Sequence, residues 1–156
     1  MQAIRASPAI DKRMPTLRVL GLDVGDRRIG IALSDALGLT AQQLMVLERR
    51  GVSTDARAVE RLVMQHQVDR LVVGLPLTMA GAQGPQAKKV MTFIATLRPR
   101  LSVPIHWIDE RLTTVQGRRA LQETGTSRRK RRQVIDQVAA QLILQQFLDM
   151  AHPRSA

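Results

Sequence analysis

Four acidic residues occupy positions where a carboxylate could take part in chemistry: Asp23, Asp109, Glu110 and Asp136. Asp23 stands at the carboxyl end of the apolar segment 17–24, and the adjacent acid pair closes the apolar segment 104–109. Asp136 begins a helical pattern whose later members Ala140, Ile143 and Phe147 are apolar. Because isolated carboxylates on buried faces are costly unless they are paired or bound to a metal, these acids need an explanation.

Three of these carboxylates converge if the two apolar segments form strands that end side by side and the last helix packs across them. Asp23, one member of the acid pair and Asp136 would then supply hard oxygen ligands, which suit Mg²⁺ or Mn²⁺. Two such ions about 3.5–4 Å apart can activate water and stabilise both oxygens of an in-line phosphodiester displacement. The acids therefore predict an oxygen-ligated metal centre.

Each acid also has a purely structural interpretation. Asp23 could be a turn residue that bonds to its own backbone, and Asp136 could pair with Arg132 four residues earlier on the helix. The two adjacent acids have opposite strand parity, so both cannot face one metal. We expect one of them to form a salt bridge with Arg111.

The elements that must position these acids follow from the apolar pattern and the capping residues. We expect strands over 17–24, 29–34, 39–48, 69–77 and 104–109, and helices from Ser53 or Thr54 to about Gln67, from Pro85 to near Pro99, from Thr113 to Gly125 and from Ser127 to about Met150. Short turns make the first three strands antiparallel, and crossovers make the later ones parallel. The predicted fold is an α/β mixed five-stranded sheet with helices on both faces, with its site beyond the carboxyl ends of the parallel strands.

Length and composition indicate one domain. The chain has 156 residues, of which we expect 1–16 to form a disordered arm, 17–150 the domain and 151–156 a flexible tail. No apolar run approaches the roughly 20 residues of a membrane span, and the N-terminus lacks the apolar region of a secretory signal. We expect a cytoplasmic protein that does not bind a membrane.

Positive charge is in excess and unevenly placed. The chain carries 24 Lys and Arg against 13 Asp and Glu, a net charge of +11. Residues 98–132 hold ten of the basic residues and three of the acids, with a peak over 128–132 at the start of the last predicted helix. Cations in a first turn oppose the helix dipole, which favours a compensating phosphate backbone over a simply solvated run. The charge predicts a nucleic-acid partner.

Several chemistries are excluded by what the sequence lacks. Without cysteine there is no disulfide, thiolate zinc site, iron–sulfur cluster or thiol nucleophile. Phe93 and Phe147 lie on apolar helical faces and are expected in the core, which argues against a platform for stacked bases. His66, His106 and His152 lack metal-ligand spacing, so we expect them at surface or edge positions.

A glycine-containing loop precedes the helix that begins at Pro85. Residues Gly81–Gly84 could hold a phosphate at the helix N-terminus, with Lys88 and Lys89 just inside. The loop lacks the Walker pattern, so an ordinary crossover loop explains it equally well.

Four segments together resemble the YqgF family, also called RuvX: GLDVGDRRIGIALSD (21–35), VVGLPLTMAGAQGPQAKKV (72–90), IDERLTT (108–114) and IDQVAAQLIL (135–144). They occur in the family's order, and the resemblance covers about residues 17–150. It implies a fold similar to ribonuclease H and to the RuvC Holliday-junction resolvases. The family is described as nucleases that mature the 5′ end of pre-16S ribosomal RNA in ribosome biogenesis, and alternatively as Holliday-junction resolvases.

The resemblance also assigns the site. It implies a metal-dependent endonuclease whose catalytic and metal-binding acids are Asp23, Glu110 and Asp136, with Asp109 as the alternative to Glu110 and two Mg²⁺ or Mn²⁺ ions. RuvC-like relatives carry an acid after the fourth strand, where this chain has the uncharged segment 74–77. That acid has moved to the next strand.

The expected partner is a structured nucleic acid, a pre-rRNA or a four-way DNA junction, bound by a monomer or a homodimer. The side chains expected to contact it are Arg27, Arg28, Lys88, Lys89, Arg111, Arg118, Arg128, Arg129, Lys130, Arg131 and Arg132. Recognition by shape and backbone is expected, because no base-reading element is apparent.

Two other functions fit parts of the sequence. The GLDVG segment also resembles the first phosphate loop of the actin, Hsp70 and sugar-kinase superfamily, but that function needs two domains closing on a nucleotide. A ribosome assembly factor could keep the fold and bind nucleic acid without cutting it. Carboxylates facing phosphate would only weaken such a binder, which favours the nuclease.

Overall fold

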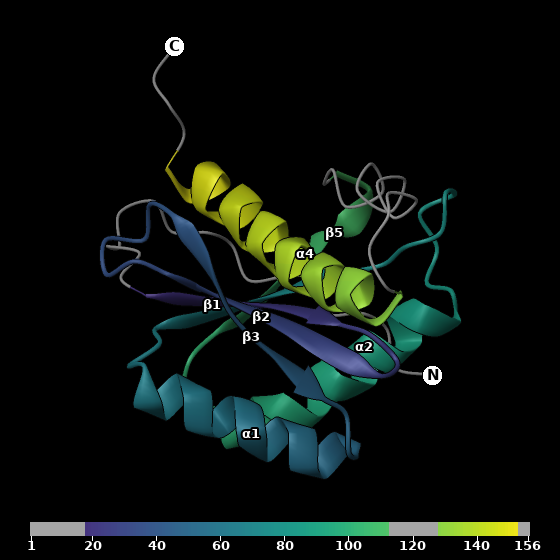
Figure 1. Ribbon diagram of the computed structural model, residues 1–156, viewed down its shortest axis with the longest axis horizontal. Helices are drawn as coiled ribbons and strands as arrows, with labels where there is room; N and C mark the ends of the chain where they lie inside the picture. Colours follow the sequence, from purple (N-terminus) through teal and green to yellow (C-terminus); the bar gives the residue numbers. More distant parts are fainter. Residues whose placement is uncertain (1–17, 113–127, 153–156) are drawn as a thin grey trace.

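The order of elements along the chain is that of a mixed sheet with crossover helices (Figure 1). The computed structural model describes residues 18–112 and 128–152, with only the backbone for Leu112 and residues 128–136. The elements are β1 (Val19–Val24), β2 (Arg28–Ser34), β3 (Ala41–Glu48), α1 (Val52–Gln65), β4 (Arg70–Leu75), α2 (Pro85–Leu97), the short 3₁₀ helix η1 (Arg98–Arg100), β5 (Ile105–Asp109), the 3₁₀ turn η2 (Glu110–Leu112) and α4 (Arg128–Ala151).

The five strands form one sheet in the order β3-β2-β1-β4-β5. β1 is antiparallel to β2, and β2 to β3, whereas β1 with β4 and β4 with β5 are parallel. All six residues of β4 are buried, as expected for a parallel strand covered on both faces. The predicted mixed five-stranded sheet is confirmed, with β1 at its centre.

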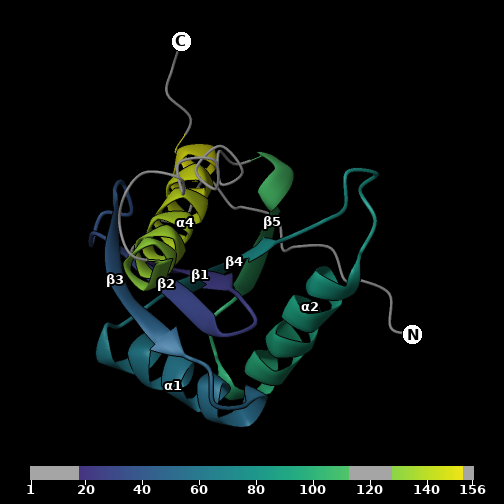
Figure 2. The same cartoon turned by 45° about the vertical axis from the view of Figure 1, so that its right-hand side comes forward.

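Of the described α-helices, α1 and α2 cover one face of the sheet and α4 covers the other (Figure 2). Successive side chains of a strand point to opposite faces, so Leu20 and Leu22 of β1 join the core under α1 and α2. Val19 joins the second core, under α4. Residues Ala140, Ile143, Leu144 and Phe147 of α4 are fully buried there, which confirms the apolar stripe predicted for this helix.

Gly21 allows α4 to lie directly on β1. A Cβ atom at this position would lie 2.8 Å from the Cβ of Leu144 and 3.2 Å from the carbonyl oxygen of Ala140. Neither atom is the end of a flexible side chain, so any larger residue would push the helix away from the sheet. The close approach fixes the height of α4 above the strand that carries Asp23.

The start of α1 differs from the sequence prediction. The helix begins at Val52 after Gly51, whose φ of 145° suits glycine, and neither Ser53 nor Thr54 caps it. Asp55, which is 1% exposed, instead accepts hydrogen bonds from the backbone N–H groups of Arg50 and Gly51. The predicted cap at Ser53 or Thr54 is therefore wrong. The side chain that accepts the hydrogen bonds before the helix is that of Asp55, inside the first turn.

His106 lies on β5, an edge strand, which is one of the two positions predicted for it, and it is 2% exposed. Its ring centroid lies 5.1 Å from that of Phe147 in α4. Phe93 and Phe147 are fully buried, as predicted.

Other predictions lie outside the described residues: the arm 1–16, the helix 113–125 with its capping box, the cap at Ser127 and most of the tail. Within 18–112 and 128–152, no helix has the length and apolar character needed to cross a membrane.

Candidate active site

Asp23 projects from the central strand toward α4. It alternates with Val19 and Gly21, which lie against α4, and its Cα partner in β2 is Gly30. It is the last but one residue of β1 and is partly buried. The sheet therefore presents this carboxylate at the carboxyl end of β1, on the face that α4 covers.

Glu110 reaches the same place from β5. The register of β1 and β4 runs as far as Leu22 beside Val73, so Asp23 and Gly74 come next on neighbouring strands. A Cβ atom on Gly74 would lie 2.7 Å from the Oε1 atom of Glu110. The Glu110 carboxylate therefore lies over Gly74, next to the strand that carries Asp23, and it is 8% exposed.

Asp136 lies in α4, one helical turn before Ala140. The helix rises about 6 Å over those four residues. This is close to the distance along β1 from Gly21 to Asp23. Because Ala140 lies over Gly21, the backbone at position 136 comes near the level of Asp23 if α4 continues toward the carboxyl end of β1. Among the side chains that the structure describes, no three metal-ligating groups gather, and the third carboxylate stays a prediction.

Asp109 faces away from this pair and binds Arg111. The Arg111 Nε atom lies 3.0 and 2.9 Å from the two carboxylate oxygens, and Nη2 lies 2.6 Å from Oδ2. The hydrogen bonds from the Arg111 side chain hold the pKa of Asp109 below its ordinary value. The expected salt bridge between Arg111 and one of the adjacent acids is confirmed, and its acid is Asp109.

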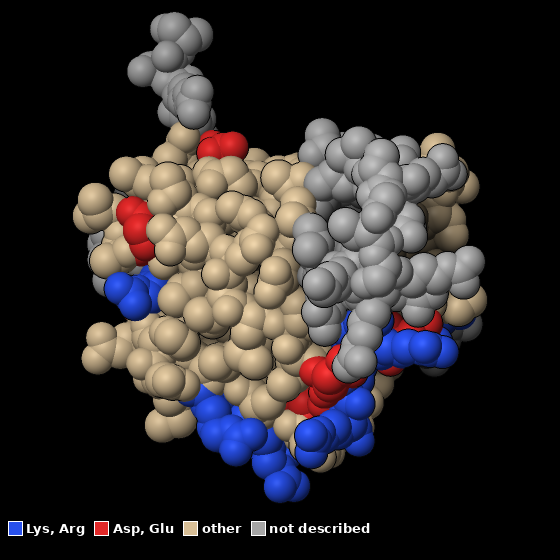
Figure 3. Space-filling view, in the orientation of Figure 1, with Lys and Arg blue, Asp and Glu red and all other residues tan. Residues whose placement is uncertain are grey.

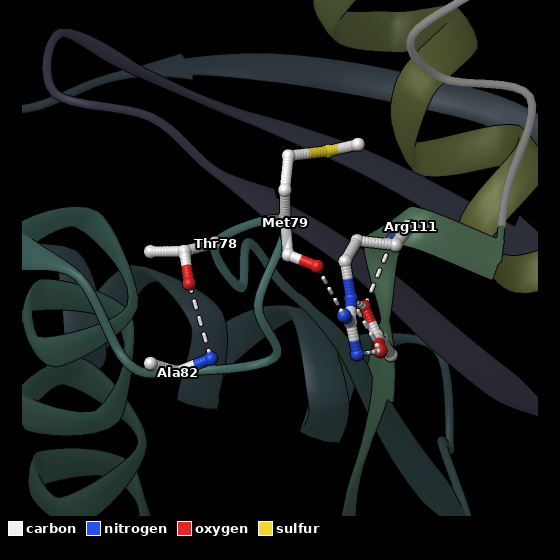
Figure 4. A network of polar contacts seen from close by, with 5 residues as sticks. Thr78, Met79, Ala82 and Arg111 are labelled. Carbon is white, nitrogen blue, oxygen red and sulfur yellow. Dashed lines mark hydrogen bonds and ion pairs between the residues drawn. The ribbon is translucent and has the colours of Figure 1, made fainter.

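Arg111 also holds the loop that follows β4. It donates a hydrogen bond to the carbonyl oxygen of Met79 at 3.3 Å, and the Thr78 hydroxyl accepts one from the N–H of Ala82 (Figure 4). Gly81 completes the turn with a φ of 81°, a conformation that favours glycine. The loop over residues 78–82 is thus fixed beside the turn that carries Glu110.

The hairpin turn after Asp23 is tied to the start of α2. Asp26 accepts hydrogen bonds from Gln86 and Lys89, both at 3.0 Å. These bonds, that from Gln86 first, lower the pKa of Asp26. The interaction explains why the glycine-containing loop and α2 lie close to the carboxyl end of β1.

The predicted nucleic-acid residues fall into four groups. Arg27 and Lys88 are exposed, whereas Lys89 and Arg111 form the ion pairs described above. Arg28 is partly buried in β2 and has an interaction within the protein. Arg118 and the side chains of 128–132 lie outside the described part. Figure 3 shows the described basic side chains along the left-hand, lower and right-hand edges of the α4 face.

Arg49 is a supporting residue that the sequence analysis did not single out. Its Nη1 atom donates to the Gly25 carbonyl at 3.1 Å, its Nε atom pairs with Asp55 at 3.1 Å, and its guanidinium lies over the Phe93 ring. It therefore joins the turn after Asp23 to the helix layer below the sheet. No spacing signal could have found it, because its partners come from three separate segments.

Comparison with known proteins gives the family. The family model described as "RuvX: Holliday junction resolvase" matches residues 17–150. The chain belongs to the RuvX family. Two relatives carry the name "Putative pre-16S rRNA nuclease": one from Moorella thermoacetica is 53% identical, covering 85% of this chain and 95% of that protein, and one from Clostridium botulinum is 45% identical, covering 85% and 97%. This RuvX chain is thus a hydrolase that acts on phosphodiester bonds.

Solved structures confirm the RNase H-like fold. Thermus thermophilus RuvC in complex with a Holliday junction substrate has a TM-score of 0.56 at 15% identity, covering 88% of this chain and 96% of that one. The fowlpox virus Holliday junction resolvase has a TM-score of 0.51 at 12% identity, covering 86% and 99%.

The described carboxylates suit a hard divalent cation. Asp23 and Glu110 offer only oxygen ligands, and Glu110 is buried against a glycine that leaves its carboxylate room. Mg²⁺ and Mn²⁺ prefer such ligands. The described donor set therefore fits the metal that the family resemblance implies.

Proposed function

We propose that this chain is a metal-dependent endonuclease that cuts structured nucleic acid in the cytoplasm, with the 5′ end of pre-16S rRNA as its substrate. The observation that carries the proposal is the placement of Asp23 and Glu110 at one edge of the sheet under α4, in a chain of net charge +11. The names of the two relatives support the choice of substrate.

In this proposal the carboxylates of Asp23, Glu110 and Asp136 would hold two Mg²⁺ or Mn²⁺ ions. Bound there, the ions would supply an activated water and charge stabilisation for both oxygens of the displacement. The protein's own part is to fix the ligands: the sheet register sets Asp23, and η2 sets Glu110. Arg27 and Lys88 bind the phosphate backbone and orient it, while the Asp26–Lys89 pair holds the two elements that carry them.

A four-way DNA junction is the second candidate substrate. It is favoured by the description of the matching family model. Symmetric resolution of a junction requires two sites, so this function needs a homodimer, whereas trimming of an RNA end does not. The mass of the enzyme in solution and its cleavage of the two substrates separate these alternatives.

The proposal predicts a difference between an aspartate of the site and an exposed aspartate elsewhere on the fold. Asp23→Asn should lower cleavage at least about 100-fold, because a neutral amide is a poor ligand for a hard cation. Asp149→Asn, the same chemical change at an exposed position near the end of α4, should keep cleavage within about threefold. The measurement is cleavage of end-labelled pre-16S rRNA, single-strand, duplex and four-way-junction substrates in Mg²⁺, in Mn²⁺ and in EDTA.

Binding separates a loss of chemistry from a loss of folding. In EDTA, Asp23→Asn should bind its substrate as tightly as the parent or more tightly, because one negative charge is gone. Cleavage by Asp23→Asn at the parent rate, or parent cleavage that persists in EDTA, would contradict the proposed function.

A further inference from the structure

Gly74 is a glycine inside a fully buried strand, a position that needs a physical reason. Glycine weakens a strand because it has no side chain to pack and loses more entropy on folding. Its neighbours in the sheet are the end of β1, which carries Asp23, and Ile108 of β5. Gly74 therefore lies between the two strands that present the site carboxylates.

The space beside Gly74 is filled by two side chains from elsewhere. A Cβ atom there would lie 2.5 Å from the Cδ1 atom of Ile143, and 2.7 and 3.0 Å from the Oε1 and Cγ atoms of Glu110. The contact with Ile143 belongs to the core under α4. The contacts with Glu110 belong to the candidate metal site.

Gly21 shows that this is not simply how glycines pack against α4. The nearest atoms to a Cβ at Gly21 are the Leu144 Cβ and the Ala140 carbonyl oxygen, both part of α4. One glycine on this face thus makes room for a helix, and the other makes room for a carboxylate as well as for Ile143.

We infer that Gly74 is a positioning residue for Glu110. Because Gly74 has no side chain, the space over this part of β4 is open. The Glu110 carboxylate extends through that space from the end of β5 toward Asp23. A metal site can then be built from β1 and β5 although β4, which separates them, contributes no acid. This inference rests on the proposed function, because the position of the Glu110 carboxylate matters for activity only if that carboxylate binds a cation.

The inference makes position 74 and position 110 interdependent. While residue 110 is glutamate, any side chain at position 74 displaces its carboxylate. When residue 110 is truncated, a methyl group at position 74 still contacts Ile143 but no longer meets the carboxylate. The same substitution should therefore have different effects in the two backgrounds.

The first test measures this coupling without metal. Thermal unfolding in EDTA compares the parent, Gly74→Ala, Glu110→Ala and the double variant. Gly74→Ala should lower the melting temperature of the parent more than it lowers that of Glu110→Ala, a non-additivity expected of groups in contact. Equal shifts in the two backgrounds would overturn the inference.

The second test measures Mn²⁺ binding by isothermal titration calorimetry, with Ile143→Val to remove the other clash. Gly74→Ala in the Ile143→Val background should weaken Mn²⁺ binding about tenfold or more, the usual cost of disturbing the support of a metal ligand. Ile143→Val alone should stay within about twofold of the parent, and this background also keeps the test usable if Gly74→Ala alone does not fold.

The outcomes distinguish this inference from the proposed function. If Glu110→Ala loses Mn²⁺ affinity but Gly74→Ala/Ile143→Val keeps it, the inference is wrong and the metal site stands. If Glu110→Ala binds Mn²⁺ as tightly as the parent, Glu110 is not a ligand, and both the proposed role of that residue and the inference fail.

Discussion

Two adjacent acids, Asp109 and Glu110, have different surroundings because the backbone turns their side chains to different sides. Asp109 ends β5 and meets the Arg111 guanidinium, whereas Glu110 begins η2 and lies over Gly74 on the α4 side. The alternation of side chains along a strand predicts that the side chains of these two residues point to opposite faces of the sheet. Which of them lies over the sheet depends on the 3₁₀ turn, which the sequence pattern does not reveal.

The Asp109–Arg111 pair predicts a pH dependence of stability. Because the pKa of Asp109 is held below its ordinary value of 3.8, the pair contributes stability above about pH 4 and loses it as the pH falls through the lowered pKa. Asp109→Asn should cost about 1 kcal/mol in the free energy of unfolding near pH 7, and the difference should shrink below pH 4. Urea unfolding of both proteins from pH 7 to pH 3 measures it.

Arg111→Lys provides the matched control for that pair. Lysine keeps the charge but lacks the planar fork that reaches both carboxylate oxygens, so it should retain only part of the stabilisation. It should also loosen the 78–82 loop, seen as faster amide exchange at Gly81 and Ala82. A difference between parent and Asp109→Asn that is the same at pH 3 and pH 7 would exclude the pair as its source.

At the scale of elements, the first turn of α1 joins several parts of the fold through one buried carboxylate. Asp55 accepts hydrogen bonds from the N–H groups of Arg50 and Gly51 and pairs with the side chain of Arg49. Arg49 in turn holds the Gly25 carbonyl in the hairpin turn that follows Asp23. The start of a helix on one face of the sheet therefore supports the turn beside the candidate site.

Asp55→Ala should destabilise the protein by about 2 kcal/mol, because it leaves backbone N–H groups and a mostly buried arginine without their acceptor. Ser53→Ala and Thr54→Ala are the controls, since both residues are exposed and neither caps the helix. Each control should change the free energy of unfolding by less than about 0.5 kcal/mol. Chemical denaturation of the three variants decides the matter, and a larger loss in Ser53→Ala or Thr54→Ala would refute this account of the helix start.

The elements themselves were largely predictable, and the contacts between them were not. β1 and β4 are continuous apolar runs because they are buried on both faces, so composition alone locates them. The stripe on α4 is equally visible, because helical spacing leads to one buried face. The reach of Glu110 over Gly74 depends on sheet register and a 3₁₀ turn together, and His106 meets a ring from α4, that of Phe147, which is distant in the sequence. Neither is encoded in local spacing.

At the scale of the whole molecule, the basic side chains that the structure describes lie around the edges of the α4 face (Figure 3). The described part of α4 presents glutamines there, and Gln141 and Gln145 bond to the backbone of residues 39–41. A phosphate backbone is therefore attracted to the margins of this face, where the hairpin turn and α2 lie. That position puts Arg27 and Lys88 beside the turn that follows Asp23.

This arrangement predicts that basic residues differ in their effect on nucleic-acid binding according to place. Arg27→Ala/Lys88→Ala, on the hairpin turn and the start of α2, should reduce the slope of log affinity against log salt by about 2, which is roughly one unit per lost phosphate contact. Arg61→Ala/Arg98→Ala is the matched control: it removes the same charge from α1 and from η1, which follows α2. Its affinity should fall slightly, with an unchanged slope, because it alters the overall field without losing a contact.

The measurement is equilibrium binding of a labelled four-way junction and of a pre-16S rRNA fragment in EDTA, over a range of KCl concentrations. Because both double variants carry the same net charge, any difference in slope reports position and not charge. A shared slope for the two variants would contradict the prediction, because Arg27 and Lys88 would then make no more phosphate contacts than the control residues do.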